Sequence, residues 1–412
     1  MGSALLVFSF WLFGLNVDLG VFGYTILFIS FLFTIIGLIC ILIFVSEKNV
    51  PRFDIPKMGR RAKRIARKIE RLFDEMTIVD ILKITPKTKY GYPVPVIKVF
   101  VDENRLEGYV LIENLGAYER IGKTTLGESI SGVMKGNQLA GYEVVRSDLE
   151  LGGMCMRFDF ENVKGLARLE VKHHDLIPFK SDSAHDIKLG NDLIWHARKY
   201  PMMSLIARTG AGKSVLAGYI ADIATLQGWE VRYNSAKQDK YVERFNGAYL
   251  VEDIVELAEK YVHVMTERLA VVAEESRDDY ADVGLNDILL VFDELGHLNA
   301  LLSDDKKLNK RWQSALKSLS MTGRSAGIHL LLISQFGTIE GFVNSSIRAQ
   351  VSDVVVMLGN AASSASERQY VMGGYADIPS RFYGIGEGLA LVSGAGRKWE
   401  EPHYYQAPWI DD

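Results

Sequence analysis

Cysteine is scarce in this sequence: Cys40 and Cys155 are the only two among 412 residues. They do not form a Cys-x-x-Cys pair, which excludes a disulfide scaffold and a structural zinc ribbon and favours a reducing, cytoplasmic setting. An excess of charge of one sign is also missing, because 47 Lys and Arg stand against 51 Asp and Glu, for a net charge of −4. With 48% hydrophobic residues, the composition excludes a disordered chain and a histone-like polycation.

Charged side chains are almost absent from residues 1–45, where Asp18 is the single exception. Within this stretch, residues 21–45 form an uncharged run of 25 residues. As a helix this run would measure about 37 Å at 1.5 Å per residue, enough to cross a hydrocarbon core of about 30 Å. A cleaved signal peptide is disfavoured, because no Lys or Arg precedes Lys48. The pattern therefore predicts a transmembrane helix.

A second apolar run precedes this helix. Residues 4–15 are uncharged but only 12 residues long, below the usual lower limit of about 17 residues for a span. Asn16, Asp18 and Gly20 then favour a tight turn. We therefore predict a transmembrane helical hairpin over residues 1–46, with a single span and an interfacial first segment as the alternative.

A basic segment follows the apolar one. Within residues 57–71 the only acid is Glu70, against eight cations: Lys57, Arg60, Arg61, Lys63, Arg64, Arg67, Lys68 and Arg71. By the positive-inside rule this flank is cytoplasmic. We therefore expect a multi-pass protein of the plasma membrane whose large domain lies in the cytoplasm.

The same segment carries an apolar seam at intervals of three and four residues, which predicts a helix with one buried stripe. The seam consists of Ala62, Ile65, Ile69, Leu72, Met76 and Val79. We interpret residues 47–90 as a basic juxtamembrane helix and linker. Its cations could contact anionic lipid or nucleic acid, and a basic run next to a span favours lipid and topology.

Residues 91–180 predict a small α+β domain. The runs "VPVIKVFVD", "GYVLIEN" and "MCMRFDF" read as strands, and "TLGESISGVMKG" reads as a short helix. No catalytic spacing is present in this region. His173 and His174 are adjacent, so their side chains diverge, and surface positions are the better interpretation.

The most informative motif is a glycine-rich loop between an apolar run, "MMSLI", and a helical pattern, "SVLAGYIADIATLQ". Strand, loop and helix in this order form the setting of a phosphate-binding loop. Its eight residues are Ala207, Arg208, Thr209, Gly210, Ala211, Gly212, Lys213 and Ser214. The two glycines allow backbone N–H groups to turn onto phosphate oxygens. Lys213 is expected to reach the β and γ phosphates of ATP, and Ser214 to bind Mg²⁺. Ala207 stands where the motif expects glycine.

A second motif follows an apolar run. "ILLVFDE", residues 288–294, predicts a buried strand that ends in Asp293 and Glu294, at the sheet edge where open α/β sheets bind ligands. We expect Asp293 to hold Mg²⁺ through water and Glu294 to orient or deprotonate the attacking water. The alternative is that both are ordinary acids at a strand end.

A third strand is predicted by "GIHLLLISQ", which ends in Gln335. In ATPases of this class a polar group at that position senses the γ phosphate. Gln335 is therefore a sensor candidate, and the alternative is a plain glutamine at the end of a strand.

In this order and spacing, "ARTGAGKSV", "ILLVFDELGHL" and "GRSAGIHLLLISQ" resemble the FtsK/SpoIIIE/HerA family of DNA-pumping ATPases. The resemblance covers roughly residues 185–395. It implies an α/β, RecA-like P-loop motor over residues 181–412. It also implies a ring, usually hexameric, that threads double-stranded DNA and hydrolyses ATP at subunit interfaces. Arg324 would then contact nucleotide or a neighbouring subunit, with a purely structural role as the alternative.

The sequence departs from chromosome translocases, since no winged-helix domain or long linker accompanies the motor. This arrangement resembles TcpA-type coupling proteins of conjugative plasmids and integrative elements. The resemblance implies a membrane-anchored DNA translocase that couples a relaxase-bound element to a secretion channel. Two alternatives stay open: a chromosome segregation or sporulation pump, and a membrane scaffold that uses nucleotide as a switch.

Overall fold

The computed structural model describes most of the chain. The described residues are 20–47, 53–73, 95–104, 107–114, 129–130, 132, 134, 141–150, 152–162, 168–172, 175–375 and 382–411. They belong to two compact units. The first comprises residues 1–103, 108–121 and 148–157, and the second comprises residues 104–107, 122–147 and 158–412. The division of the chain at residues 46, 90 and 180, which was made from the sequence, stays a prediction.

The structure contradicts the expectation of a multi-pass membrane protein. Among the residues it describes, no helix is both long and apolar enough to cross a membrane. Helix α2, Gly20–Glu47, is the helix that falls in the predicted hairpin. The first apolar run, residues 4–15, lies outside the described residues, so the predicted transmembrane hairpin is unsupported.

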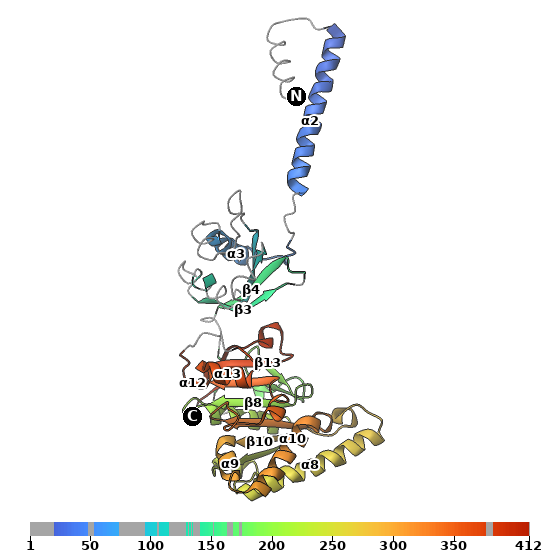
Figure 1. Ribbon diagram of the computed structural model, residues 1–412. Coiled ribbons are helices and arrows are strands. Elements are labelled where there is room, and N and C mark those ends of the chain that lie inside the picture. Colours follow the sequence, from blue (N-terminus) through green and yellow to red (C-terminus); the bar gives the residue numbers. More distant parts are fainter. Residues whose placement is uncertain are drawn as a thin grey trace. The chain divides into compact units, whose positions relative to one another are not determined.

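The basic segment forms helix α3, Arg60–Phe73, which packs against strand β1, Ile97–Val101 (Figure 1). Strand β1 pairs antiparallel with β2, Glu107–Glu113. Strands β3, Tyr142–Leu149, and β4, Cys155–Asn162, complete a four-stranded sheet of order β1-β2-β4-β3. Three strands predicted from apolar runs therefore exist. The short helix predicted after β2 and the pair His173–His174 fall mostly or wholly outside the described residues.

The large unit is built on a seven-stranded sheet of order β14-β13-β12-β8-β11-β10-β9. Its strands are β8 (Met202–Ala207), β9 (Glu230–Ser235), β10 (Ile288–Asp293), β11 (Ile328–Ser334), β12 (Val354–Leu358), β13 (Glu387–Val392) and β14 (His403–Gln406). Strands β8 to β12 run parallel to one another. Strands β13 and β14 are added at one edge in antiparallel pairing. The α/β class predicted from the sequence is confirmed.

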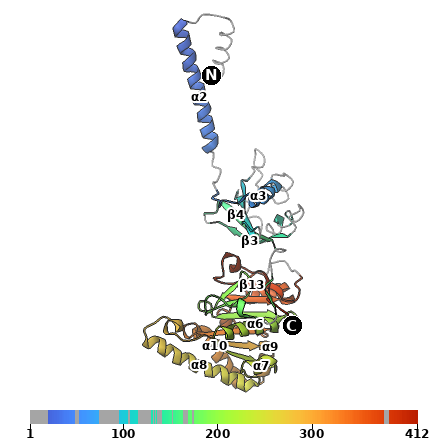
Figure 2. The ribbon, with the colours of Figure 1, turned by 180° about the vertical axis from the view of Figure 1, so that it is seen from behind.

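Helices cover both faces of this sheet, because its central strands are apolar on both sides. In β8, Leu205 faces a core shared with α6, Lys213–Leu226, whereas Ile206 faces the core of the opposite side. That second core also contains side chains of α8 (Val251–Glu274), α9 (Leu295–Leu302) and α10 (Lys306–Ala326). Figure 1 shows α8, α9 and α10 beside β10, and Figure 2 brings α6 into view.

Shorter elements complete the large unit. They are β5 (Glu170–Val171), η1 (Ile177–Phe179), β6 (Asp186–Lys188), β7 (Ile194–His196), α7 (Lys240–Arg244), η2 (Tyr280–Val283), α11 (Ser345–Arg348), α12 (Asn360–Ser363), α13 (Ala365–Val371), η3 (Arg397–Glu400) and β15 (Trp409–Ile410). Strand β15 pairs with β5, and β6 pairs with β7.

Candidate nucleotide site

Three strand ends meet at one edge of the large sheet. Strands β8, β11 and β10 are neighbours in that order and run parallel, so their carboxyl ends share an edge. The glycine-rich loop follows β8, Gln335 follows β11, and Glu294 follows β10. Because β11 lies between the other two, Gln335 is placed between the loop and the carboxylates.

The glycine-rich loop has the backbone that its sequence predicts. Gly210 and Gly212 have φ values of 82° and 96°, in the left-handed region that glycine adopts without strain. A Cβ at Gly210 would meet no atom within 4 Å, so substitution there is opposed by backbone strain and not by crowding. Ala207 is the buried last residue of β8 and is not among the residues with positive φ. Glycine is therefore not required at the position where the motif expects it.

Lys213 begins helix α6 and turns its ammonium toward the carboxylates. Its Nζ donates hydrogen bonds to Asp293 Oδ1 at 3.1 Å and to Glu294 Oε1 at 2.7 Å. The lysine side chain is only 7% exposed, so its positive charge is balanced by the two acids. Ser214 is the next residue of α6 and is half-buried.

Asp293 is fixed by three donors. Beside the lysine, the backbone N–H of Glu294 donates to Oδ1 at 2.7 Å, and the hydroxyl of Tyr233 donates to Oδ2 at 2.7 Å. Burial, together with the nearby carboxylate of Asp293, raises the pKa of Tyr233, so its hydroxyl remains a proton donor over the working pH range. The sequence analysis did not identify Tyr233. The signal that could have pointed to it is its position near the end of β9, the strand that pairs with β10.

Glu294 has a backbone conformation that is unusual for its residue type. Its φ is 55°, in the left-handed region that favours glycine. The strain occurs where β10 ends and α9 begins. Residues held in such conformations occur preferentially at functional sites.

The electrostatic environment keeps Glu294 ionised. Burial by itself would raise the pKa of this carboxyl. Hydrogen bonds from Lys213 and Gln335, with the positive charge of Lys213, outweigh burial and hold the pKa below its ordinary value. A carboxylate that stays charged at neutral pH can accept a proton or orient a water molecule.

Gln335 joins the loop to the carboxylates. Its Nε2 donates to Glu294 Oε2 at 2.9 Å, and its Oε1 accepts a hydrogen bond from Thr209 Oγ1 at 3.2 Å. The result is a chain of hydrogen bonds from Thr209 through Gln335 and Glu294 to Lys213. The structure thus brings together the loop, both acids and the glutamine that the sequence singled out.

Arg324 does not belong to this cluster. It lies in the last turn of α10, before the amino end of β11, and its side chain is exposed. The seven residues of β11 separate that end from Gln335 by about 23 Å at 3.3 Å per residue. Arg324 therefore cannot reach the nucleotide site of its own chain.

A second contact network surrounds the loop, and the sequence did not reveal it. The guanidinium of Arg208 pairs with Glu367 of α13 and lies over the ring of Phe336, 4.1 Å from the centroid. The other oxygen of Glu367, Oε2, accepts a hydrogen bond from the N–H of Gly337 at 2.9 Å. These contacts link the phosphate-binding loop to the segment just after Gln335. Because Arg208 and Glu367 are far apart in sequence, no local pattern predicts their contact.

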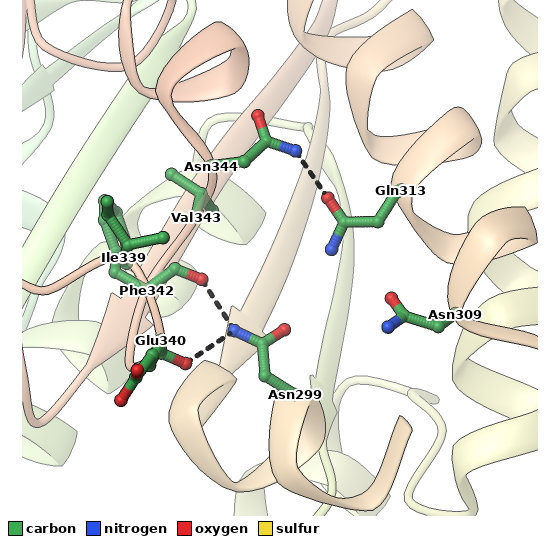
Figure 3. A pocket seen from close by; sticks show the side chains of 8 residues that line it. All are labelled: Asn299, Asn309, Gln313, Ile339, Glu340, Phe342, Val343 and Asn344. Carbon is green, nitrogen blue, oxygen red and sulfur yellow. Dashed lines mark hydrogen bonds between the residues drawn. The ribbon is translucent and has the colours of Figure 1, made fainter. Parts of the chain in front are cut away.

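Amide side chains hold that segment against the helices (Figure 3). Asn299 of α9 donates to the carbonyls of Phe342 at 2.8 Å and Glu340 at 3.4 Å. Asn344 donates to Gln313 of α10 at 2.7 Å. A groove of about 760 Å³ runs beside this segment and includes Glu294 and Gln335 in its lining. The sheet edge that carries Glu294 and Gln335 therefore opens onto a surface groove.

No family model matches the chain, and no curated protein matches it significantly. Among solved structures, the monomer form of the pCW3 conjugation coupling protein TcpA with ATPγS superposes with a TM-score of 0.54 at 16% identity, covering 84% of this chain and 96% of that one. The chain shares the fold of TcpA.

Two secretion ATPases superpose less well. The cytoplasmic domain of the Thermomonospora curvata Type VII secretion ATPase EccC gives a TM-score of 0.43 at 17% identity, covering 58% of this chain and 31% of that one. EssC (ATPases 2 and 3) from Geobacillus thermodenitrificans gives 0.44 at 11% identity, covering 59% and 47%. These two superpositions are too weak to support an inference.

Proposed function

We propose that this chain is an ATPase that drives DNA translocation, acting as a coupling protein in conjugative transfer. The observation that carries the proposal is the contact of Lys213 with Asp293 and Glu294 at 3.1 and 2.7 Å. It places the lysine of a phosphate-binding loop beside two carboxylates at one sheet edge. The TcpA fold, which in the solved structure accompanies ATPγS, supports the same reading.

Each residue of the site has a distinct task in this proposal. The N–H groups around Gly210 and Gly212 bind phosphate oxygens, and Lys213 supplies positive charge to the β and γ phosphates. Glu294 accepts a proton from the attacking water. Gln335 positions Glu294 and meets the γ phosphate.

The donor set also fits a magnesium ion. No group of three or more His, Cys, Asp or Glu side chains in the described residues could hold a metal by itself. Mg²⁺ is ordinarily bound by one or two carboxylates together with substrate phosphates. Ser214 and Asp293 would hold the ion, which would neutralise charge on the phosphates.

The proposal includes a ring of subunits, in which Arg324 would serve a neighbouring subunit. Arg324 lies too far from the nucleotide site of its own chain to act there, so any contact that it makes with nucleotide would be in a neighbouring subunit. We propose a homo-oligomer, hexameric as the resemblance implies, with double-stranded DNA in the centre and a relaxase and channel proteins as partners. Mixing Arg324→Ala chains with Lys213→Ala chains tests this: each is inactive alone, and mixed rings regain ATP hydrolysis. Absence of recovery in mixed rings would contradict a role in trans.

The main test is ATP hydrolysis by the purified full-length chain with and without double-stranded DNA. We expect DNA to stimulate turnover, and Glu294→Gln to abolish it while nucleotide still binds. The matched control is Glu274→Gln, which removes the same charge at an exposed position at the end of α8. If an assembled ring hydrolyses ATP and DNA does not stimulate it, the proposal is wrong and a nucleotide-dependent switch is favoured.

A further inference from the structure

Helix α3 has a buried apolar face. Five apolar residues of this helix are at most 8% exposed: Ala62, Ala66, Ile69, Leu72 and Phe73. The only acid of α3, Glu70, is used inside the fold, since its Oε1 accepts the backbone N–H of Val99 in β1 at 3.2 Å. The sulfur of Met58 likewise accepts the N–H of Val101 at 3.3 Å. Helix α3 and the residues before it thus cover the open edge of strand β1.

The opposite face of α3 is cationic. Six of its seven exposed cations, all except Arg61, recur at intervals of three, one, three, one and three residues, which places them along one side of the helix. They are Arg60, Lys63, Arg64, Arg67, Lys68 and Arg71. They line a surface groove of about 670 Å³ together with Leu72. Within the described part of the chain, no carboxylate forms an ion pair with any of the six. We call this surface the α3 cationic face.

We propose that the α3 cationic face binds the phosphate backbone of duplex DNA. The distance along the helix from Arg60 to Arg71 is about 16 Å at 1.5 Å per residue. A duplex of that length carries about ten phosphates, at one charge per 1.7 Å of axis. One side of the duplex therefore offers several phosphates to the six cations. The inference rests on the proposed function only for the choice of DNA as the polyanion.

Duplex DNA fits this surface better than a lipid bilayer does. A helix that lies on a membrane inserts an apolar face below the headgroups. Five apolar side chains of α3 are buried in the fold and Ile65 is partly buried, so the exposed positions of the helix are all occupied by cations. Four of the six are arginines, whose planar guanidinium groups can bind a phosphate through two hydrogen bonds. The α3 cationic face therefore suits the phosphodiester oxygens of a duplex that approaches it from solvent.

The test measures the affinity of the full-length chain for a labelled duplex by fluorescence anisotropy, without nucleotide, between about 50 and 200 mM salt. If four phosphates are neutralised, the affinity should fall roughly 100-fold over this range. The variant Arg64→Glu/Arg67→Glu/Arg71→Glu should bind at least about tenfold more weakly at the lower salt and show a flatter salt dependence. Arg-to-Lys changes at the same three positions keep the charge and should preserve most of the salt dependence.

The matched control reverses three exposed cations of the other unit, Lys260→Glu/Arg277→Glu/Lys317→Glu. It changes the net charge equally and should leave the affinity close to that of the wild type. Thermal unfolding of both triple variants establishes that they are folded. Equal DNA affinity of the two triple variants would overturn the proposal.

A second arm separates DNA from lipid. The same proteins are sedimented with vesicles of phosphatidylserine and phosphatidylcholine. If the triple Arg-to-Glu variant of α3 loses vesicle binding and keeps its DNA affinity, the α3 cationic face binds lipid and the proposal is wrong. DNA affinity without nucleotide does not depend on ATP hydrolysis, so this proposal and the proposed function can fail independently.

Discussion

The ammonium of Lys213 donates to the carboxylate of Glu294 across 2.7 Å. Both side chains are largely buried, at 7% and 14% exposure, and they follow β8 and β10, the two parallel strands that flank β11. The phosphates of a bound nucleotide would draw on the same ammonium, which links nucleotide binding to the freedom of Glu294. The pair therefore connects the group proposed to bind phosphate to the group proposed to act on water.

Lys213→Met should abolish most ATP hydrolysis. The loss of a positive charge aimed at the phosphates is expected to lower kcat roughly 100-fold or more. Steady-state kinetics with full-length protein measures this. Lys260→Met, which removes an exposed lysine on α8, is the control and should behave as the wild type. Near-normal turnover by Lys213→Met would place the chemistry elsewhere.

Tyr233→Phe should reduce turnover in a protein that remains folded. The variant removes the hydroxyl that donates to Asp293 Oδ2 at 2.7 Å. The free energy of unfolding should fall by about 1–3 kcal/mol, because a buried carboxylate loses one of its donors. Turnover of the folded protein should also fall, because Asp293 loses a donor that orients it. Comparison of kcat at saturating Mg²⁺ with thermal unfolding separates the two effects, and an unchanged rate would leave Tyr233 with a structural role alone.

Arg208→Ala should destabilise the fold as well as the loop. Its partner Glu367 has a side chain only 5% exposed, so the variant leaves a buried carboxylate without its cation. We expect a loss of about 1–3 kcal/mol in the free energy of unfolding, read as a lower midpoint in thermal unfolding. The double variant Arg208→Ala/Glu367→Gln removes the unpaired charge and should recover part of the loss. A double variant no more stable than Arg208→Ala would contradict this account.

Acid should weaken the fold through Asp287. His329 Nε2 lies 2.8 Å from its Oδ1, His185 Nδ1 lies 2.7 Å from its Oδ2, and the hydroxyl of Tyr280 donates to Oδ1. Burial would raise the pKa of Asp287, but these hydrogen bonds and the charge of His329 outweigh burial and lower it. The stabilisation is therefore complete above the unfolded-state pKa of about 3.9 and is lost as the pH falls below it.

Thermal unfolding of the wild type and Asp287→Asn from neutral to acid pH measures this contribution. The variant should unfold at a lower temperature at neutral pH, and the difference should shrink as the pH falls below about 4. A difference that stays constant over the whole range would show that the charge of Asp287 contributes nothing to stability.

The glycine-rich loop and the strand-end acids could be predicted from sequence because short segments fix them. Two glycines before a lysine, or five apolar residues before two acids, specify local geometry without distant contacts. The same reasoning predicted the central strands, since apolar runs bounded by polar residues leave few alternatives. It went wrong over the transmembrane hairpin, since no helix among the residues that the structure describes is both long and apolar enough to cross a membrane.

The sequence by itself determined the kind of site: a phosphate-binding loop, two carboxylates and a glutamine, each at the end of a strand. Only the tertiary structure decided how they meet. Strand order placed Gln335 between the loop and Glu294, the contact of Lys213 with Glu294 joined the segments that follow β8 and β10, and the length of β11 removed Arg324 from the site. These relations depend on which strands pair, and strand pairing is set by the packing of residues far apart in the chain, which no local pattern records.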